Sequence, residues 1–287
     1  MKLILLILVL AFQLPSHHNA DSHLLESGKA ATPRKESPAR NEVKVVSYNI
    51  RWRSGDELKR LTKVLKEDPE VGGAAIMGLQ EVDRRKKRSG HSNVAKEMAD
   101  ELGLHYAWAA PPAAKSGDEE ETGVAILSVY PLSDVRRIVL PHNGPDGRRR
   151  VALGATVEVD KQKWRVYSAH AETRLSLDKK TEQFNAILQD LAKYPPDTPA
   201  IVMGDLNTWQ ADAERKTIKL FSTAGLRTPF GAQTTFKRRI LLVPIELRLD
   251  WVWLRGLEPA SYGIDRKVGF SDHWPLWTNV KAPPKKQ

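Results

Sequence analysis

The stretch Ile201-Val202-Met203-Gly204-Asp205-Leu206-Asn207 is an apolar run of strand length that ends in an acid and an amide. A run of this kind, bounded by glycine and polar residues, is typical of a β-strand buried on one or both faces. Asp205 and Asn207 stand two positions apart, so in an extended segment their side chains point to the same face. The stretch therefore predicts a buried strand that delivers two polar side chains to one place.

The same pattern recurs along the chain, in short apolar segments that carry a metal-seeking or proton-handling residue near one end. The further segments are Val45–Asn49, Ala75–Glu81, Trp164–His170, Leu249–Trp253 and Ser271–Leu276. Buried strands that bring Asn, Glu, His and Asp to matching ends predict an oxygen-rich pocket that also contains imidazoles. Oxygen ligands favour Mg, Ca or Mn over zinc.

Segments with helical spacing lie between these strands. Glu57–Leu65 and Lys179–Tyr194 each place apolar residues on one stripe of a helix. Strands mixed with helices, with the polar residues clustered at strand ends, predict an α/β layered fold.

Six short motifs follow one another between Val43 and Val280: Ser47–Arg51, Leu79–Arg84, Gly123–Ser128, Gly204–Thr208, Leu249–Trp251 and Ser271–His273. In this order they resemble the endonuclease/exonuclease/phosphatase superfamily, the deoxyribonuclease I-like metal-dependent phosphohydrolases. The resemblance implies an α/β (α+β) four-layer sandwich, in which two mostly antiparallel β-sheets pack face to face with helices on both outer faces. Any one motif would be weak, but six in the same order are specific.

The ends of the chain differ in character from its middle. Lys2, the apolar stretch Leu3–Phe12 and a polar region up to Ala20 have the layout of a secretory signal peptide, so export is expected. An uncleaved membrane anchor is the less favoured alternative, because a membrane-spanning helix needs roughly 20 apolar residues. The composition predicts a signal peptide (1–20), a flexible linker (21–42), one folded domain (43–281) and a basic tail (282–287). With no cysteine in the chain, disulfide bonds and thiolate metal sites are excluded.

Three residues are expected on the metal side of the site. Glu81 ends a buried-strand pattern, where a carboxylate would be desolvated unless it met a cation or a hydrogen-bond donor. Asn49 would lie beside Glu81, its amide oxygen serving as a neutral ligand or its NH2 group orienting the carboxylate. Asp272 would bind the metal directly or through water. The expected cofactor is Mg (or Mn), as one or two divalent ions.

Five residues are expected to act on the phosphate, the attacking water and the proton. His273 would stabilise the scissile phosphate or activate water, and Asp250 would orient its ring, a dyad that the resemblance also implies. Asp205 would position or deprotonate the water, and Asn207 would hold a phosphate oxygen or the water itself. The resemblance suggests that His170 hydrogen-bonds the phosphate from the opposite side. Taken singly, Asp250 and His170 are more typical of ordinary strand-end residues, and a turn at Asp205 and Asn207 is the less favoured alternative.

The substrate is expected to be a polyanion. Arg51 and Arg150 are the predicted substrate contacts, because guanidinium groups match phosphate oxygens, although either could be plain surface charge. The net charge of +10, with basic clusters at Arg84–Arg88, Arg148–Arg150 and Lys237–Arg239 that are expected in loops near the motifs, favours nucleic acid. A lipid headgroup or a small phosphate ester is the alternative. No stable protein partner is inferred.

Two apolar features remain open. The run Ile240–Ile245 is expected to pack in the core, or else to touch a lipid surface as an apolar hairpin does in the sphingomyelinase branch of the superfamily. Four of the eight tryptophans could stack on bases, although most large aromatics in such a domain are core residues: Trp52, Trp108, Trp209 and Trp274. The sequence thus predicts an exported phosphodiesterase acting on nucleic acid by water attack on phosphorus. A lipid-headgroup phosphodiesterase or an inositol or sugar phosphatase is the alternative, and a non-catalytic polyanion-binding relative is disfavoured by the complete set of site residues.

Overall fold

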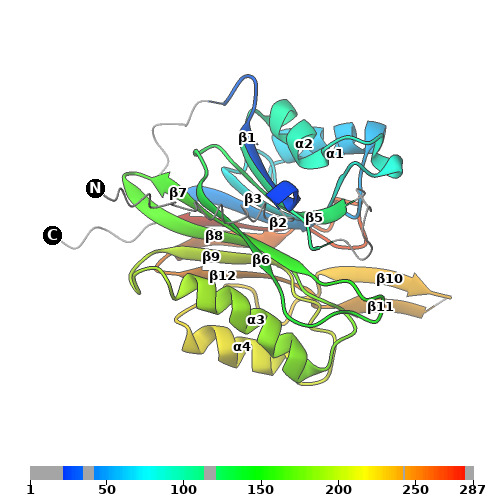
Figure 1. Cartoon of the computed structure of the whole chain (residues 1–287), viewed down its shortest axis with the longest axis vertical. Coiled ribbons are helices and arrows are strands. Elements are labelled where there is room, and N and C mark those ends of the chain that lie inside the picture. Colours follow the sequence, from blue (N-terminus) through cyan, green and yellow to red (C-terminus); the bar gives the residue numbers. More distant parts are fainter. Residues whose placement is uncertain (1–21, 35–41, 113–120, 242, 282–287) are drawn as a thin grey trace, which may run out of the picture.

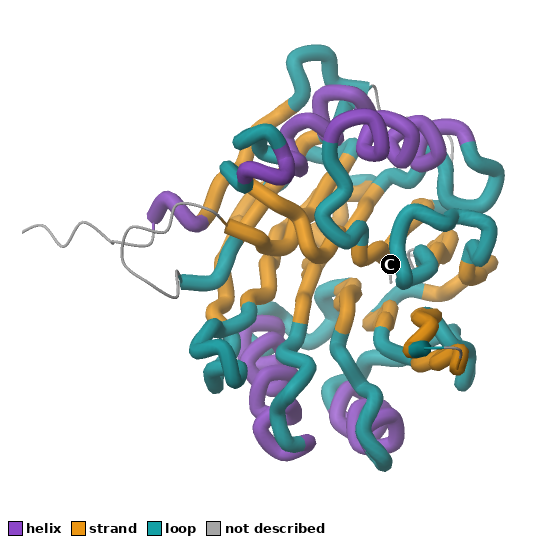
Figure 2. The backbone as a smooth tube through the Cα atoms, turned by 90° about the vertical axis from the view of Figure 1, so that its right-hand side faces the viewer, coloured by secondary structure: helices purple, strands orange, loops and turns teal. Residues whose placement is uncertain are grey.

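Two β-sheets packed face to face form the centre of the molecule, and helices cover the outer face of each (Figure 1). The computed structural model describes residues 22–34, 42–112, 121–241 and 243–281. Figure 2 shows the resulting layers of helix, sheet, sheet and helix. The four-layer sandwich predicted from the sequence is confirmed.

The larger sheet has seven strands in the order β1-β4-β5-β3-β2-β14-β13. Its strands are β1 (Leu25–Lys29), β2 (Val43–Asn49), β3 (Ile76–Arg84), β4 (His105–Ala109), β5 (Glu121–Ser128), β13 (Glu258–Ile264) and β14 (Leu276–Lys281). The central β2 and β3 pair in parallel, and the other neighbours in this sheet are antiparallel. The parallel pair matters for function because it brings the ends of β2 and β3 to the same edge.

The second sheet has five strands in the order β12-β9-β8-β7-β6. Its strands are β6 (Ser133–Val139), β7 (Val151–Val159), β8 (Gln162–His170), β9 (Ala200–Asp205) and β12 (Asp250–Arg255). Here β8 and β9 pair in parallel, and the remaining pairs are antiparallel. A separate two-stranded hairpin consists of β10 (Phe236–Ile240) and β11 (Val243–Leu247) and extends beyond the sheets (Figure 1).

Two helices lie on the outer face of each sheet (Figure 1). They are α1 (Gly55–Glu67) and α2 (Val94–Leu102) on the seven-stranded sheet, and α3 (Leu177–Leu191) and α4 (Ala213–Thr223) on the five-stranded sheet, with short 3-10 turns at Ser22–Leu24 and Lys87–Ser89. Leu58, Leu61 and Leu65 of α1 are buried in one stripe, as the spacing in the sequence predicts. The helix predicted over Lys179–Tyr194 is α3, which ends at Leu191.

Aromatic side chains fix the five-stranded sheet to its helices. Trp251 and Trp253 of β12 stack with ring centroids 4.9 Å apart, and Phe221 of α4 stacks on Trp253 at 4.7 Å. All three are buried. Removing such a ring by substitution with alanine typically costs about 3–5 kcal/mol of stability. This packing fixes β12 to α4, and backbone pairing with β9 then sets the position of Asp250.

Residues 22–34 are not the flexible linker that the composition suggests. β1 pairs with β4 from Leu25↔Ala109 to Lys29↔His105 and becomes an edge strand of the seven-stranded sheet. Glu26 accepts a hydrogen bond from the Tyr106 hydroxyl at 2.7 Å. The strand is short and polar, as edge strands often are, so its composition resembles that of a linker. The linker prediction is wrong for these residues, and the folded domain begins before Val43.

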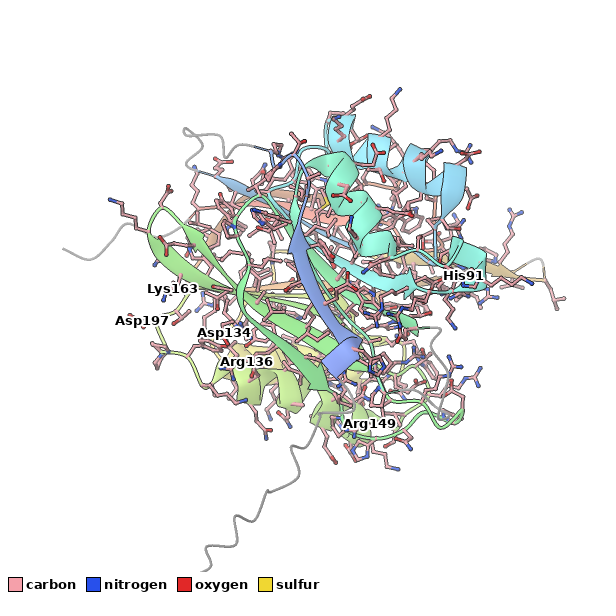
Figure 3. All side chains as sticks on the ribbon, turned by 45° about the horizontal axis from the view of Figure 1, so that its top comes forward. His91, Asp134, Arg136, Arg149, Lys163 and Asp197 are labelled. Carbon is pink, nitrogen blue, oxygen red and sulfur yellow. The ribbon has the colours of Figure 1, made fainter. Side chains whose placement is uncertain are left out.

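An edge strand of the five-stranded sheet, β6, is also rich in charge. Its Asp134 and Arg136 form an ion pair of 2.9 Å and lie side by side at the surface (Figure 3). Charged side chains of this kind discourage pairing with another chain.

The predicted signal peptide (1–20) and basic tail (282–287) lie outside the described residues. Within the described part of the chain, no helix has the length and apolar character needed to cross a membrane.

The described residues of the apolar run Ile240–Ile245, which leave out Leu242, lie in the β10–β11 hairpin and not in the core. Leu241 is 92% exposed and Val243 is 63% exposed. The strands pair from Phe236↔Leu247 to Ile240↔Val243, so the run surrounds the turn at the far end of the hairpin. The core-packing prediction is wrong because an apolar run carries no information on whether a second layer covers it.

Candidate active site

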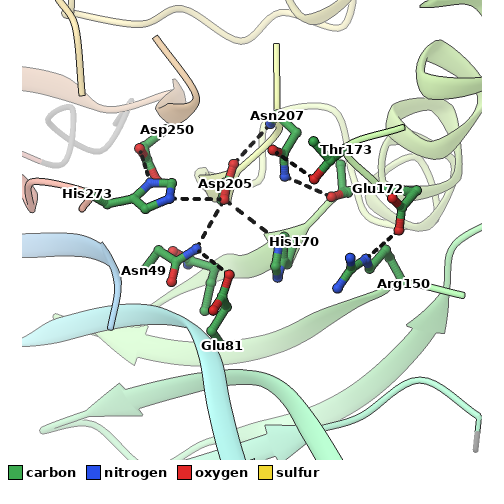
Figure 4. Close-up of polar contacts among 12 residues, drawn as sticks. Asn49, Glu81, Arg150, His170, Glu172, Thr173, Asp205, Asn207, Asp250 and His273 are labelled. Carbon is green, nitrogen blue, oxygen red and sulfur yellow. Dashed lines mark hydrogen bonds and ion pairs between the residues drawn. The ribbon is translucent and has the colours of Figure 1, made fainter. Parts of the chain in front are cut away.

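Strand ends from the two sheets meet at one place (Figure 4). In the seven-stranded sheet, β2 ends at Asn49 and the neighbouring β3 carries Glu81. In the five-stranded sheet, His170 at the end of β8 is paired with Asp205 at the end of β9. Asp205 is also paired with Asp250 at the start of β12. The topology therefore gathers five of the predicted site residues without help from loops.

Asp205 is the centre of this group. One of its carboxylate oxygens, Oδ2, accepts a hydrogen bond from Asn49 Nδ2 at 3.1 Å and lies 3.7 Å from Nε2 of both His170 and His273. Its other oxygen accepts a hydrogen bond from the backbone amide of Asn207 at 3.0 Å. The side chain is almost fully buried. Two imidazoles and one amide thus converge on a single carboxylate oxygen.

His273 and Asp250 form the dyad that the sequence predicts. Nδ1 of His273 is 2.8 Å from Oδ2 of Asp250, which leaves Nε2 facing Asp205. Thr235, which the sequence did not single out, donates a hydrogen bond from its hydroxyl to the same Asp250 oxygen at 2.7 Å. The ring of Phe236 packs edge-on against the imidazole with centroids 4.9 Å apart. These contacts fix the orientation of the ring.

The buried charges shift one another's pKa values. Burial, helped by the carboxylates of Asp250 and Glu81 and opposed by His273, raises the pKa of Asp205 to about 7. Burial alone would lower the pKa of His273, but Asp250 and Asp205 outweigh it and raise the pKa to about 10. Burial is the main reason that the pKa of His170 lies well below its usual value. One imidazole is therefore held as a cation and the other as a neutral group.

Glu81 and Asp272 lie on the side of the site nearer the seven-stranded sheet. Asn49 Nδ2 donates to Glu81 Oε1 at 3.3 Å, and Asn49 Oδ1 accepts from the backbone amide of Arg51 at 3.1 Å. The structure therefore shows Asn49 in the second of its two expected roles, orienting the carboxylate. Asp272 forms an ion pair of 3.1 Å with the Arg51 guanidinium. Both acids line the same cleft.

A divalent cation fits this group of oxygens. Oε2 of Glu81 is buried and has no hydrogen-bond partner among the described residues, and burial raises the Glu81 pKa. A second set, Asp205, Asp250 and His273, has ligand atoms within 4.8 Å of one another. Because Asp250 and His273 are already hydrogen-bonded to each other, Glu81 is the better first ligand. Carboxylate oxygens suit a hard ion such as Mg or Mn.

Asn207 is bound into a loop and does not continue the strand. β9 ends at Asp205, and Asn207 has a left-handed backbone with φ 52°. Its Nδ2 donates to the carbonyl of Ala171 at 3.0 Å, and its Oδ1 accepts from the hydroxyl of Thr173 at 3.1 Å. Lys180 of α3 donates to its backbone carbonyl. The expected extended conformation is wrong at Asn207, although both side chains still line one cleft.

Backbone strain is concentrated at the site. Non-glycine residues with positive φ there are Arg51, Trp52, Glu81 and Asn207. Such conformations cost about 1–3 kcal/mol each and persist where the surrounding structure enforces them. Gly204, directly before Asp205, has φ 143°, and a Cβ at this position would lie 2.0 Å from the carbonyl oxygen of Ala169. Only glycine lets β9 approach β8 this closely.

These side chains border a cleft of about 530 Å³. Eight of the ten predicted site residues line it, and Asn49 and Asp250 lie behind its wall. The lining residues that the sequence did not assign to the site are Trp52, Thr173, Trp209, Phe236, Arg238, Leu247 and Leu249. A larger hollow of about 690 Å³ between α1 and α2 contains none of the site residues, so the chemistry points to the smaller cleft.

Arg150 is held beside His170 by an acid. Its Nε donates to Oε2 of Glu172 at 2.8 Å, and its charge contributes to the low pKa of His170. The position of Glu172 is fixed in turn by Gln183 of α3. The Gln183 side chain accepts a hydrogen bond from the backbone amide of Glu172 at 2.9 Å and donates one to the backbone carbonyl of Pro141. Both predicted arginines, Arg51 and Arg150, are therefore in the cleft and each is paired with a carboxylate.

Two arginines of the first basic cluster, Arg84 and Arg88, form ion pairs with acids. Arg84 ends β3 and is buried, where its guanidinium pairs with Glu121 at 2.9 Å and Glu26 at 3.1 Å. Arg88 pairs with Asp83 at 2.6 Å. The cluster was expected in a loop, which is wrong for Arg84, the last residue of β3. The sequence does not show where in this basic run the strand ends and the loop begins.

The sequence profile of the Endonuclease/Exonuclease/phosphatase family matches residues 46–273. The chain belongs to this family. Phosphoester hydrolysis is the reaction of the family and the enzymes are metal-dependent, so the chain is a phosphoric ester hydrolase. A search of curated proteins by sequence found no match.

Solved structures share the endonuclease/exonuclease/phosphatase fold. An endonuclease/exonuclease/phosphatase from Beutenbergia cavernae DSM 12333 has TM-score 0.67 and 18% identity, over 85% of this chain and 72% of that one. The human Nocturnin catalytic domain with bound sulfate has TM-score 0.63 and 18% identity, over 85% and 95%. D. rerio TDP2 complexed with single strand DNA product has TM-score 0.62 and 16% identity, over 85% and 100%. At these identities the likeness establishes the fold.

Proposed function

We propose that the chain is an exported phosphodiesterase, dependent on Mg or Mn, that cleaves nucleic acid by attack of water on phosphorus. The observation that supports it most is the convergence of Asn49, His170 and His273 on one oxygen of Asp205. This arrangement can hold a water and a phosphate in fixed relation to a base and a cation. Export rests on the signal-like leader alone.

Each side chain has a defined task in this proposal. Asp205 Oδ2 orients the water and takes its proton, which its raised pKa favours. His273 Nε2, kept cationic by Asp250, stabilises negative charge on the phosphate, and neutral His170 donates a hydrogen bond from the other side. Glu81 and Asp272 would hold the divalent ion. When bound, the ion would neutralise charge on the phosphate oxygens.

The cleft favours an anionic, extended substrate. Arg51, Arg150 and Arg238 all line it, and the chain has a net charge of +10. Phosphate contacts of this kind dominate the affinity of proteins for nucleic acid. The bound single strand DNA product in the similar TDP2 structure supports the same substrate class.

A lipid headgroup is the second candidate, and one observation favours it. The exposed Leu241 and Val243 lie at the end of the β10–β11 hairpin, and β10 carries exposed Lys237, Arg238 and Arg239. Apolar side chains next to basic ones suit the surface of an anionic membrane. In this case the cleft would receive a phosphodiester from the membrane, since Arg238 belongs to both the hairpin and the cleft lining.

The first experiment is cleavage of supercoiled plasmid and of a single-stranded oligonucleotide by the purified chain from residue 21 onward, with Mg and after removal of metal by EDTA. We expect cleavage that requires the metal and is lost in Asp205→Asn. Vesicles of phosphatidylglycerol and phosphatidylcholine are assayed in parallel for released headgroup. Folded wild-type protein that leaves DNA intact and hydrolyses the vesicles would replace the proposal with the second candidate.

Two further measurements test metal binding and export. Mg should raise the unfolding temperature of EDTA-treated protein, because a ligand that binds the native state stabilises it, and Glu81→Gln should remove most of this shift. An equal shift in the variant would exclude Glu81 as a ligand. Mass spectrometry of the product expressed from the full sequence should find a mature N-terminus near residue 21 outside the cytoplasm, and retention of the whole leader in the cell would contradict export.

A further inference from the structure

Trp209 is an exposed tryptophan held in a fixed position at the cleft. It is 49% exposed, whereas Trp108, Trp164, Trp251 and Trp253 are buried. Its indole Nε1 donates a hydrogen bond to the carbonyl of Thr173 at 2.9 Å. Half of a large apolar ring is thus left in water while its polar atom is used to anchor it. A fixed ring with a free face is suited to receive a flat ligand.

The anchor places this ring beside the reacting groups. Thr173, which accepts from Trp209, donates through its hydroxyl to the Asn207 side chain at 3.1 Å. Trp209 follows Asn207 by two residues, and both line the cleft with His170 and Asp205. The ring therefore occupies the wall next to the place where the phosphate is proposed to bind.

The other exposed tryptophan of the cleft is in a different state. Trp52 is 38% exposed, and the guanidinium groups of Arg88 and Arg51 lie 4.3 Å and 5.6 Å from the centre of its ring. Among the described residues, neither a cation nor another aromatic ring stacks on Trp209. Trp209 is thus the ring whose face is available.

We propose that Trp209 is the stacking platform for a nucleobase next to the scissile phosphate, and that the substrate is a single strand of nucleic acid. This inference rests on the proposed function and adds the substrate class. Bases stack on aromatic side chains irrespective of sequence. In a duplex the base faces are covered by neighbouring pairs, so the ring could reach one only after the pair had opened. A quaternary ammonium headgroup also binds aromatic faces, but the exposed cationic side chain of Arg238 in the same cleft disfavours it.

The test compares oligonucleotides of one length and backbone, with bases and with abasic tetrahydrofuran sites, as single strands and as a duplex. For the wild type, kcat/KM should be higher for the base-bearing single strand than for the abasic strand by about 5- to 100-fold, the range expected for one stacked base. The duplex should be a poorer substrate than the single strand. In Trp209→Ala the ratio of base-bearing to abasic kcat/KM should fall towards one.

Two variants separate stacking from support of the loop. Trp209→Phe keeps an aromatic face but loses the bond to Thr173, so it should retain most of the ratio. Ile218→Ala removes an exposed apolar side chain on α4 and should keep the full ratio.

An unchanged ratio in Trp209→Ala overturns the stacking inference while leaving the phosphodiesterase in place, and so does an equal loss in Trp209→Phe. A duplex cleaved as well as the single strand overturns the substrate class. If wild-type protein cleaves neither oligonucleotide, the proposed function itself fails. Release of choline phosphate from phosphatidylcholine vesicles that depends on Trp209 would assign the ring to a headgroup and overturn the inference.

Discussion

Two buried aspartates show how differently one side chain can serve this protein. Asp205 is desolvated among other acids, which raises its pKa to about 7, whereas Asp190 is paired with Arg165 at 3.1 Å and hydrogen-bonded by the hydroxyl of Tyr167 at 2.9 Å. In the first arrangement, burial and the nearby acids outweigh the hydrogen bonds and His273, so the carboxylate can take up a proton near neutral pH. The second satisfies it. Burial alone therefore does not separate a catalytic acid from a structural one, but the partners do.

Replacement of Asp205 by Asn should abolish most activity and leave the fold intact. Loss of a positioned general base typically lowers kcat by about 10²–10⁴-fold. Because burial raises the pKa of Asp205, a neutral amide at this position should leave the unfolding temperature equal or higher. The matched change Asp190→Asn should do the reverse, since breaking a buried ion pair costs about 3–5 kcal/mol. Steady-state kinetics and thermal unfolding of both variants check this, and parallel losses in Asp205→Asn would show a structural role.

Lys180 should make stability depend on pH. It is fully buried, and burial lowers its pKa to about 8, opposed by Asp205 and Glu172. Above that pH the folded state has released a proton that the unfolded chain retains up to about pH 10.4, so this group's contribution to stability rises between the two values. Below about pH 8 the buried charge is a full cost.

Urea unfolding of the wild type and of Lys180→Met across this pH range measures the effect. The difference in unfolding free energy should move in favour of the wild type as the pH rises. Lys216→Met, at an exposed lysine of α4, serves as the control for the substitution itself. Parallel curves for Lys180→Met would mean that Lys180 titrates normally.

At the residue scale the sequence was informative about the acids and histidines but not about their supports. All ten predicted site residues converge, because each stands at or near a strand end or in a motif with fixed order. Thr235, Thr173 and Lys180 come from loop and helix positions with no local pattern, and their importance follows only from contacts across the fold. Such residues could not have been found from spacing.

Among the elements, β1 is the one that the composition misassigned, and it is open to a direct test. Leu24, which precedes β1, is 1% exposed and packs in the core beneath α1 and α2. If residues 22–34 are part of the folded domain, Leu24→Ala should cost about 2–5 kcal/mol, as is usual for a buried leucine. The same substitution at Leu241, which is 92% exposed, should cost almost nothing. Denaturant unfolding of the two variants decides, and equal stabilities would restore the flexible linker.

The core-packing prediction for the β10–β11 hairpin and the linker prediction for β1 were wrong for opposite reasons. β1 is polar but ordered, because its partner β4 supplies the backbone hydrogen bonds. The buried side chains are those of Leu24 and Ala30, which flank the strand on either side. The β10–β11 hairpin is apolar at its end but exposed, because no layer covers it. The hydrophobic pattern of an element predicts which of its faces is buried when a second layer packs against it. Whether such a layer is present depends on the whole fold.

For the whole molecule, the pattern and the motifs were sufficient to predict the sandwich. The strands β2, β3, β8, β9 and β12 read as strands because they are apolar and buried on both faces. Their pairing order was not predicted, because strands of similar composition do not specify their neighbours. The sheet order then places every strand end that carries a site residue at one edge of the sandwich (Figure 4).

The distribution of charge over the whole molecule leads to a last prediction, on salt. If a single strand contacts Arg51, Arg150 and Arg238 in the cleft, its affinity should fall with salt with a logarithmic slope of about −2, since each contact on a single strand contributes about −0.7. Arg238→Gln should reduce the slope by about 0.7. Arg215→Gln, on α4 away from the cleft lining, should not change it. Fluorescence anisotropy with a labelled oligonucleotide at several salt concentrations measures both slopes. If Arg238→Gln and Arg215→Gln reduced the salt slope equally, binding would respond to the net charge of +10 and not to contacts in the cleft.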